Sequence, residues 1–286
     1  MNTMRFGLAA LLLIALPVAA LAQSPYITIL GIAQDGGHPQ AGCTRPDCIA
    51  AWKNPKLRKH VASVAIVDPL SKQQWIIDAT PDFPEQLTML DSPKIDGIFL
   101  THAHIGHYLG LAQLGREVMG THDLPVYAMP RMRAFLEHNG PWDQLVRIGN
   151  IKIESLENER AVWLNERITI TPVLVPHRDE YSETVAFIVR GPNRSILWLP
   201  DIDRLPEKSL VDRVDIAFID GTFHDEKELP GRKRSEIPHP VMVDSMKAFS
   251  PSKVRFIHLN QSNPALHDPS IVKPFQVAKE RERIKL

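Results

Sequence analysis

The chain has 286 residues, with 33 Lys and Arg against 33 Asp and Glu, so its formal net charge is zero. Apolar residues make up 44 % of the sequence and only two residues are cysteine, which excludes a disordered chain, a polytopic membrane protein and a small disulfide-built fold. A neutral chain also lacks the excess positive charge that binds nucleic acid, so we expect no nucleic-acid partner.

The first 23 residues have the pattern of a secretory signal peptide. Arg5 is their only charged residue, an apolar run follows at residues 6–16, and Pro17 ends that run. The Ala-Leu-Ala sequence that ends at Ala22 is typical of a cleavage site. We therefore expect cleavage near Ala22, a single mature domain at residues 24–286 in the periplasm or outside the cell, and no membrane attachment after cleavage.

Short apolar runs rich in β-branched residues alternate with helical patterns along the mature chain. Runs of about five to eight residues are typical of strands. They predict strands at residues 26–32, 63–67, 74–78, 97–101, 168–175, 185–189, 196–199, 215–219 and 254–258. Helical patterns predict helices at residues 83–90, 107–119, 129–139 and 239–249. This mixture indicates an α/β or α+β domain with layered sheets.

Three histidines occur within six residues where a predicted strand meets a predicted helix. His102 and His104 are two residues apart on an extended segment and can point to the same side, and His107 begins the next element. With 12 histidines in 286 residues, chance does not account for such a cluster. Because imidazole is the commonest metal ligand near neutral pH, the cluster predicts a metal site.

Polar residues follow three further apolar runs. His177 comes directly after the run at 168–175, Asp201 follows 196–199, and His258 ends 254–258. A single polar residue at a strand end is usually a loop residue or a cap. Three of them alongside the histidine cluster predict one cleft at the strand ends.

This ordered set resembles the signature of the metallo-β-lactamase superfamily, which is His-x-His-x-Asp-His followed by a distant His, Asp and His. The resemblance implies an α+β fold, a four-layered αβ/βα sandwich of two packed sheets flanked by helices, with metal between the sheet edges. It also implies the ligands: His102, His104 and His177 for the first metal, His107 and His258 for the second, and Asp201 as a bridge.

Within the superfamily, the chain resembles the branch named for pyrroloquinoline-quinone biosynthesis protein B. The Gly-rich loop at residues 30–40, Cys43 and Cys48, and the segments at 200–203 and 258–264 carry this resemblance. It implies an Fe²⁺-dependent oxidoreductase. The predicted signal peptide does not fit a cytosolic biosynthetic protein and favours a periplasmic relative with another substrate.

The chain departs from the signature at Gly106, where the superfamily has an Asp that ligates the second metal. Either the first position alone is filled, or a weakened second position is completed by water or by a side chain such as Asp203 or His224. We expect one tight Zn²⁺ and a weaker second ion, with Fe²⁺ or Mn²⁺ as alternative occupants. On this interpretation, Gly106→Asp raises the metal-to-protein ratio towards two.

A zinc-bound water has a pKa near 7, so we expect hydroxide to be the nucleophile. Asp201 is expected to orient this water in addition to ligating the metal. His239 has a place in the chain similar to that of the proton-donating histidine in the superfamily's phosphodiesterase and tRNA-processing branches, and His224 is a second candidate donor. Asp220 is a candidate partner that orients a neighbouring imidazole.

Together these residues predict a secreted or periplasmic metal-dependent hydrolase that acts on an ester, lactone, phosphodiester or β-lactam bond of a small molecule. The first alternative is the Fe²⁺-dependent oxidoreductase of the biosynthesis-protein-B branch. The second is a non-catalytic metal-binding relative, which only Gly106 supports.

Two interpretations of Cys43 and Cys48 are open. In an oxidising compartment the pair forms a local disulfide. Related cytosolic proteins use this region for a structural zinc, although two cysteines alone do not complete a tetrahedral site.

Overall fold

The computed structural model describes residues 24–233 and 236–286. The predicted signal peptide, residues 1–23, lies outside the described residues. Across the described ranges, no helix has the length and the hydropathy that a membrane span requires.

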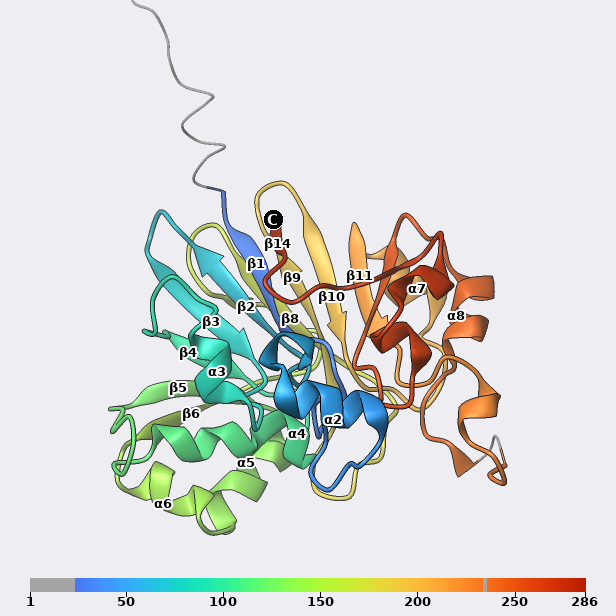
Figure 1. Ribbon diagram of the computed structural model, residues 1–286. Coiled ribbons are helices and arrows are strands. Elements are labelled where there is room, and N and C mark those ends of the chain that lie inside the picture. Colours follow the sequence, from blue (N-terminus) through green and yellow to red (C-terminus); the bar gives the residue numbers. More distant parts are fainter. Residues whose placement is uncertain (1–23, 234–235) are drawn as a thin grey trace, which may run out of the picture.

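Two seven-stranded mixed sheets pack face to face (Figure 1), in the orders β14-β1-β2-β3-β4-β5-β6 and β13-β12-β11-β10-β9-β8-β7. The first sheet contains β1 (Tyr26–Gly31), β2 (Ser63–Asp68), β3 (Gln73–Ile77), β4 (Gly97–Phe99), β5 (Leu124–Ala128), β6 (Ile151–Ser155) and β14 (Arg283–Lys285). The second contains β7 (Val162–Trp163), β8 (Thr169–Leu174), β9 (Val185–Arg190), β10 (Ser195–Leu199), β11 (Ile216–Asp220), β12 (Val254–Ile257) and β13 (Gln276–Val277).

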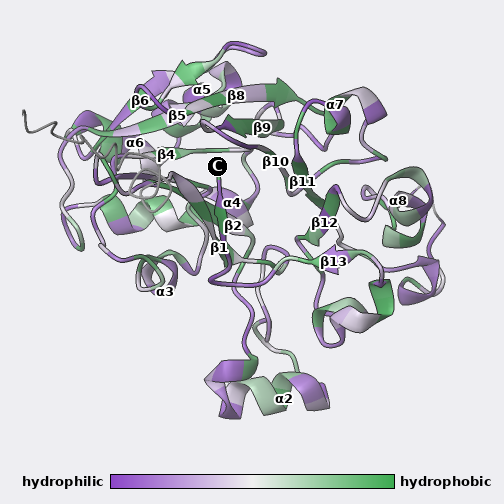
Figure 2. Ribbon diagram, turned by 90° about the horizontal axis from the view of Figure 1, so that it is seen from above, coloured by the Kyte–Doolittle hydropathy of each residue, from purple (hydrophilic) through white to green (hydrophobic). Residues whose placement is uncertain are grey.

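Helices cover the outer face of each sheet. Beside the first sheet lie α3 (Phe83–Leu87), α4 (Ile105–Tyr108), α5 (Pro130–His138) and α6 (Trp142–Arg147), and beside the second lie α7 (Lys208–Asp212) and α8 (Met242–Ala248). A further helix, α2 (Pro46–Lys53), stands away from both sheets when the molecule is seen from above (Figure 2). Two packed sheets flanked by helices are the predicted α+β sandwich.

The strand β3 shows how the sequence produces these layers. Trp75 and Ile77 belong to the core between the two sheets, while Ile76, which points to the opposite face, belongs to the core under α3 to α6. Successive side chains of a strand point to opposite faces, so a strand covered on both faces is apolar throughout. The short unbroken apolar runs in the sequence are therefore the inner strands.

All nine predicted strands are present, each within two residues of its predicted bounds. The sequence showed no recognised pattern for the strands β5, β6, β7, β13 and β14 or for the helices α2, α6 and α7. The helix predicted at 107–119 is wrong: α4 ends at Tyr108, and a 3₁₀ helix follows at Leu109–Leu114. Gly110 lies close to the loop that follows β3. Its N–H donates to Ala79 O at 2.9 Å and not to a carbonyl one turn earlier, so the α-helix does not continue.

Candidate metal centre

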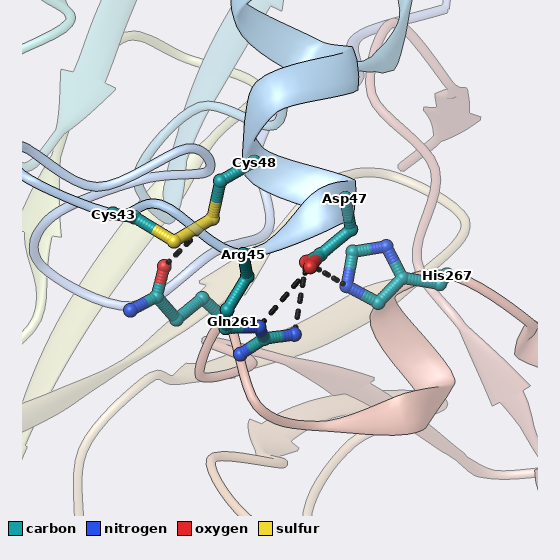
Figure 3. The surroundings of a disulfide bond; sticks show 6 residues. All are labelled: Cys43, Arg45, Asp47, Cys48, Gln261 and His267. Carbon is teal, nitrogen blue, oxygen red and sulfur yellow. Dashed lines mark hydrogen bonds and ion pairs between the residues drawn. A yellow bond between two sulfur atoms is a disulfide. The ribbon is translucent and has the colours of Figure 1, made fainter.

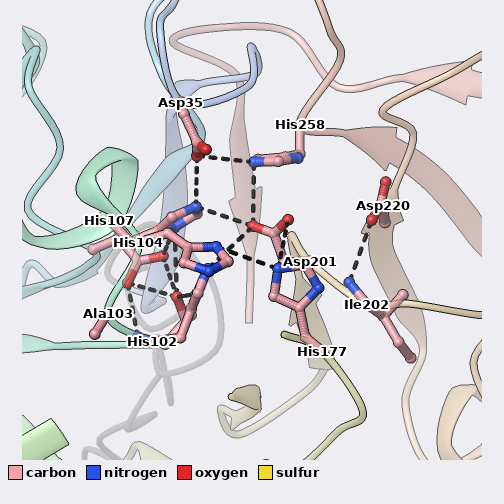
Figure 4. A network of polar contacts seen from close by, with 12 residues as sticks. Asp35, His102, Ala103, His104, His107, His177, Asp201, Ile202, Asp220 and His258 are labelled. Carbon is pink, nitrogen blue, oxygen red and sulfur yellow. Dashed lines mark hydrogen bonds and ion pairs between the residues drawn. The ribbon is translucent and has the colours of Figure 1, made fainter. Parts of the chain in front are cut away.

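The candidate site lies where parallel strands end. Strands β3 and β4 are parallel, and so are β10, β11 and β12. The carboxyl ends of parallel strands meet at one edge of a sheet, which is where α/β sheets commonly bind ligands. Residues that follow these strands therefore converge in space, as Figure 4 shows for His102, Asp201 and His258.

The structure brings together the three histidines expected to bind the first metal. One ring nitrogen each from His102, His104 and His177 lies within 4.8 Å of the others. The ring centroids of His102 and His104 are 4.4 Å apart, and those of His104 and His177 are 5.0 Å apart. His102 and His177 are buried, and His104 is partly exposed, so this set faces solvent on one side.

Asp201 lies between the first metal set, formed by the three histidines above, and a second metal set that contains His107 and His258. Its Oδ2 is 3.0 Å from His107 Nε2 and 3.2 Å from His258 Nε2. The same oxygen is 3.8 Å from His102 Nε2, and Oδ1 is 3.7 Å from His177 Nε2. This position between two groups of imidazoles is the one that a bridging carboxylate requires.

Asp35 is a candidate ligand that the sequence did not single out. Its Oδ1 is 3.2 Å from His107 Nε2 and 3.5 Å from His258 Nε2, and these atoms converge with Asp201 to form a second group. Asp35 lies in the Gly-rich loop after β1. The pattern that selected Asp201, a carboxylate soon after an apolar strand, was also present here.

Five buried polar atoms at this centre have no hydrogen-bond partner among the described residues. They are Asp35 Oδ1, His102 Nε2, His107 Nε2, Asp201 Oδ2 and His258 Nε2. Buried polar atoms are normally hydrogen-bonded, and unsatisfied ones in a native site call for an ion or another ligand. Because all five converge on one region and are imidazole nitrogens or carboxylate oxygens, these residues fit divalent metal ions.

The charge states of His102, His177 and Asp201 suit metal binding. Burial lowers the pKa of His102 well below its usual value and also lowers the pKa of His177, so both rings are neutral at pH 7. Neutral imidazole is the form that binds metals. Burial alone would raise the pKa of Asp201, but the imidazoles of His258 and His107 hold it well below its usual range, so this carboxylate is ionised.

Most of the imidazoles are held from behind by an oxygen. Asp78 Oδ2 accepts a hydrogen bond from His107 Nδ1 at 2.7 Å, and Asp203 Oδ1 accepts one from His177 Nδ1 at 2.9 Å. Thr222 Oγ1 lies 3.0 Å from His258 Nδ1. Such partners fix the ring orientation and leave the other nitrogen to face the metal. Asp203 therefore does not complete the second metal set, as the sequence had allowed, but orients a ligand of the first.

Two residues at this edge have left-handed backbone conformations: Asp78 has φ 67° and His258 has φ 61°. Residues other than glycine seldom adopt positive φ, and such strain is retained where the surrounding structure requires it. Here each residue places a polar side chain in the site at the end of a buried strand.

Replacing the buried carboxylate of Asp78 should weaken metal binding without removing a ligand. In Asp78→Asn, we expect the affinity for the second metal to fall about 10-fold to 100-fold, because an outer partner of a ligating histidine typically contributes that much. The dissociation constant, measured by competition with a chromogenic chelator, checks this. An unchanged constant would show that Asp78 does not orient His107.

The structure brings His239 to the site but not His224. His239 Nδ1 lies 2.7 Å from Asp220 Oδ2 and 3.8 Å from Asp201 Oδ1. Burial alone would lower the pKa of His239, but the Asp220 carboxylate raises it. His224 has its Nδ1 3.5 Å from Asp225 Oδ2, and in the described ranges it belongs to no group of convergent metal ligands. The proposed roles of His224, as proton donor and as ligand, therefore have no support in the structure.

Cys43 and Cys48 form a disulfide, which decides between the two interpretations of this pair. Figure 3 shows Gln261 beside the bond and Asp47 between Arg45 and His267. Asp47 Oδ2 is 2.8 Å from Arg45 Nη2 and 3.4 Å from His267 Nε2. The cysteine sulfurs are therefore bonded to each other and do not serve as zinc ligands.

The double variant Cys43→Ser/Cys48→Ser should lose stability but keep its metal. A disulfide that closes so short a loop contributes about 2 kcal/mol by the chain-entropy account. We expect a lower melting temperature and an unchanged metal-to-protein ratio, measured by calorimetry and elemental analysis. Loss of metal from this variant would show that the thiolates ligate a metal after all.

Comparisons with known proteins agree with this fold. A family model described as a beta-lactamase superfamily domain matches residues 74–259. Among solved structures, Zn²⁺-bound PqqB from Methylobacterium extorquens has a TM-score of 0.78 at 21 % identity, covering 91 % of this chain and 100 % of its own. A diphosphatase from the PhnP family has a TM-score of 0.69 at 23 % identity, covering 92 % and 97 %. At these identities the likeness shows the fold alone.

Curated relatives share one name. Coenzyme PQQ synthesis protein B from Xanthomonas oryzae pv. oryzae is 23 % identical over 85 % of this chain and 92 % of its own length. The protein of the same name from Pseudomonas syringae pv. syringae is 26 % identical over 86 % and 92 %. The expectation of a secreted hydrolase is therefore wrong: the relatives agree with the alternative, the biosynthesis-protein-B branch.

Proposed function

Because the chain belongs to the β-lactamase superfamily, we propose that it is a metal-dependent oxidoreductase related to coenzyme PQQ synthesis protein B. Its substrate is a small aromatic molecule and its oxidant is dioxygen. Support comes from the names of the curated relatives and, within this chain, from the ligand types at the second metal set.

The second set carries the proposal. It offers two imidazoles, from His107 and His258, together with the carboxylates of Asp201 and Asp35, and no thiolate. Two histidines with a carboxylate are the ligand set of non-haem Fe²⁺ oxygenases. When bound there, Fe²⁺ would supply a redox-active centre with open positions for dioxygen and substrate.

His239 supplies a proton in this proposal. Its side chain is buried, and its ring lies 5.6 Å from that of His177 and 6.0 Å from that of His258, measured between centroids. Asp220 holds the proton on Nδ1 by a 2.7 Å hydrogen bond. An imidazole that holds a proton beside the reacting groups is suited to general acid–base chemistry.

Apolar and aromatic residues beside His104 favour an aromatic substrate. Ile105 is 61 % exposed and Tyr181 is 64 % exposed. Tyr181 follows Glu180, whose Oε2 lies 3.1 Å from His104 Nε2. The ring of Tyr181 contacts that of Phe135, with 5.5 Å between their centroids. Exposed aromatic surface next to a polar site is typical of binding sites for small ring compounds.

Oxygen consumption by the Fe²⁺-loaded protein tests this function. Protein loaded anaerobically is mixed with air-saturated buffer containing L-DOPA or catechol. We expect one dioxygen to be consumed, and one hydrogen peroxide to be formed, for each catechol oxidised to its quinone. Fe²⁺-treated His107→Ala, which lacks a ligand of the second set, measures the background oxidation by free iron. The Zn²⁺-loaded protein measures oxidation without a redox-active metal. Uptake no faster than in these controls with both compounds would contradict the proposal.

The cellular location is a separate part of the proposal, and we place the protein in the periplasm. The Cys43–Cys48 disulfide supports an oxidising compartment, and the pattern of residues 1–23 supports export. Fractionation of cells, with N-terminal mass analysis, should recover a periplasmic protein that begins near Gln23. Recovery of the uncleaved chain with free thiols in the cytosol would contradict this location.

A further inference from the structure

The carboxylate of Asp35 occupies the space that a side chain at residue 106 would fill. A Cβ placed on Gly106 would lie 2.3 Å from Asp35 Oδ1 and 2.7 Å from both Asp35 Cγ and the backbone atom Asp35 Cα. Cβ atoms are essentially never so close to other atoms. Gly106 is also the position at which the histidine signature lacks its expected carboxylate. The absence of a side chain at Gly106 therefore makes room for Asp35, which supplies a carboxylate in the same region.

The same oxygen of Asp35 faces the second metal set. Asp35 Oδ1 is 3.2 Å from His107 Nε2 and 3.5 Å from His258 Nε2 (Figure 4), and it is buried without a hydrogen-bond partner. Its convergence with the two imidazoles and Asp201 gives four potential ligands of suitable type for one divalent ion.

The loop that carries Asp35 is fixed beside His258. Gln34 N donates to Leu259 O at 2.9 Å, and Leu259 N donates to Ile32 O at 2.8 Å. Leu259 is the neighbour of His258 in the chain, so the segment after β1 is bound directly to the segment that presents this ligand. The backbone thus places the carboxylate before any ion arrives.

We propose that Asp35 is a ligand of the second metal and takes over the place left by Gly106. Sequence analysis left that position incomplete, with one tight ion and a weak second one. With Asp35 the second set has four donors, and the chain holds two ions tightly. The inference rests on the metal centre of the proposed function but on none of its redox chemistry.

The proposal reverses the expectation for Gly106→Asp. The added carboxylate meets Asp35 instead of empty space, so the single variant should bind the second ion more weakly than the unaltered protein. Moving the carboxylate as a pair, in Asp35→Gly/Gly106→Asp, restores a donor close to His107 and removes the contacts with the side chain of Asp35. The 2.7 Å approach to the backbone Cα of residue 35 remains, so the backbone there has to shift.

Metal binding by matched variants tests this. Co²⁺ is titrated into the metal-free form of six proteins. They are the unaltered protein, Asp35→Asn, Asp35→Ala, Gly106→Asp, the double variant and the partly exposed control Asp244→Asn. The visible absorption gives the affinities for the two ions, and elemental analysis gives the number of ions bound. Thermal melting confirms that each variant is folded. We expect two ions for the unaltered protein and the control, and a second affinity at least 100-fold lower in both Asp35 variants and in Gly106→Asp. Because a Cβ at residue 106 still meets the Cα of residue 35, the double variant should recover only part of the lost affinity.

The outcomes separate this inference from the function on which it rests. Two ions bound with unchanged affinity in both Asp35→Asn and Asp35→Ala would overturn the role of Asp35 and leave the metal centre intact. No ion bound by the unaltered protein would overturn the metal centre, and with it both proposals. A second ion bound by Gly106→Asp as tightly as by the unaltered protein would contradict the exchange of position between residues 35 and 106.

Discussion

Asp201→Asn is expected to abolish metal-dependent activity. The substitution keeps the size of the side chain but removes the charge that lies between the two metal sets, 3.0 Å from His107 and 3.8 Å from His102. We expect the metal-to-protein ratio to fall from two to one or less and oxygen uptake to fall at least 100-fold, since even outer partners of ligands contribute about 10-fold to 100-fold. Elemental analysis and an oxygen electrode measure both.

The control for this variant removes a carboxylate of the same kind elsewhere. Asp212 lies on α7 with 57 % of its side chain exposed, and Asp212→Asn should keep both the ratio and the rate. A ratio of two in Asp201→Asn would show that the carboxylate does not join the two sets. The interpretation of the centre as a bridged pair would then fail.

His239→Gln is expected to slow oxidation while the metal stays bound. Glutamine still forms hydrogen bonds but cannot exchange a proton at neutral pH, and general acid–base catalysis typically contributes about 100-fold to 10,000-fold. We therefore expect oxygen uptake to fall within that range and the metal-to-protein ratio to remain at two. The comparison separates a catalytic residue from a ligand, because Asp201→Asn loses both.

A matched histidine supplies the control for His239. His138 is exposed at the end of α5 and bonds to Ala134 O at 2.8 Å, so His138→Gln should leave the rate unchanged. Equal rates in His239→Gln and the unaltered protein would remove His239 from the reaction. Loss of metal in His239→Gln would make it a ligand instead, in keeping with its convergence with Asp201, Asp220 and His258.

The fold was largely predictable because its inner strands are buried on both faces. Such strands appear in the sequence as short apolar runs, as β3 and β10 do, and their bounds follow from where the run stops. Edge strands such as β14 lack this signal, since Arg283 and Lys285 are exposed and the strand exists only because it pairs with β1. The helix predicted after His107 failed for a similar reason, because contact with residues 79–80 decides its course.

The site was predictable where its residues follow recognised strands. His102, His177 and His258 were identified by their place after apolar runs, and the structure brings them to one edge. Asp35 was not identified, although it follows an apolar strand as Asp201 does, because its convergence with His107 and His258 exists only in the folded chain. Asp78 was likewise missed, although it ends a predicted strand, because an orienting carboxylate is recognised only once its histidine is in contact.

Diffraction data collected at the iron and zinc absorption edges, from crystals of protein purified without chelators, test the metal centre most directly. The account predicts two anomalous peaks. One lies among His102, His104 and His177, and the other among Asp35, His107 and His258, with Asp201 between them. Crystals with no anomalous peak at either metal set would contradict the assignment of this region as a metal centre.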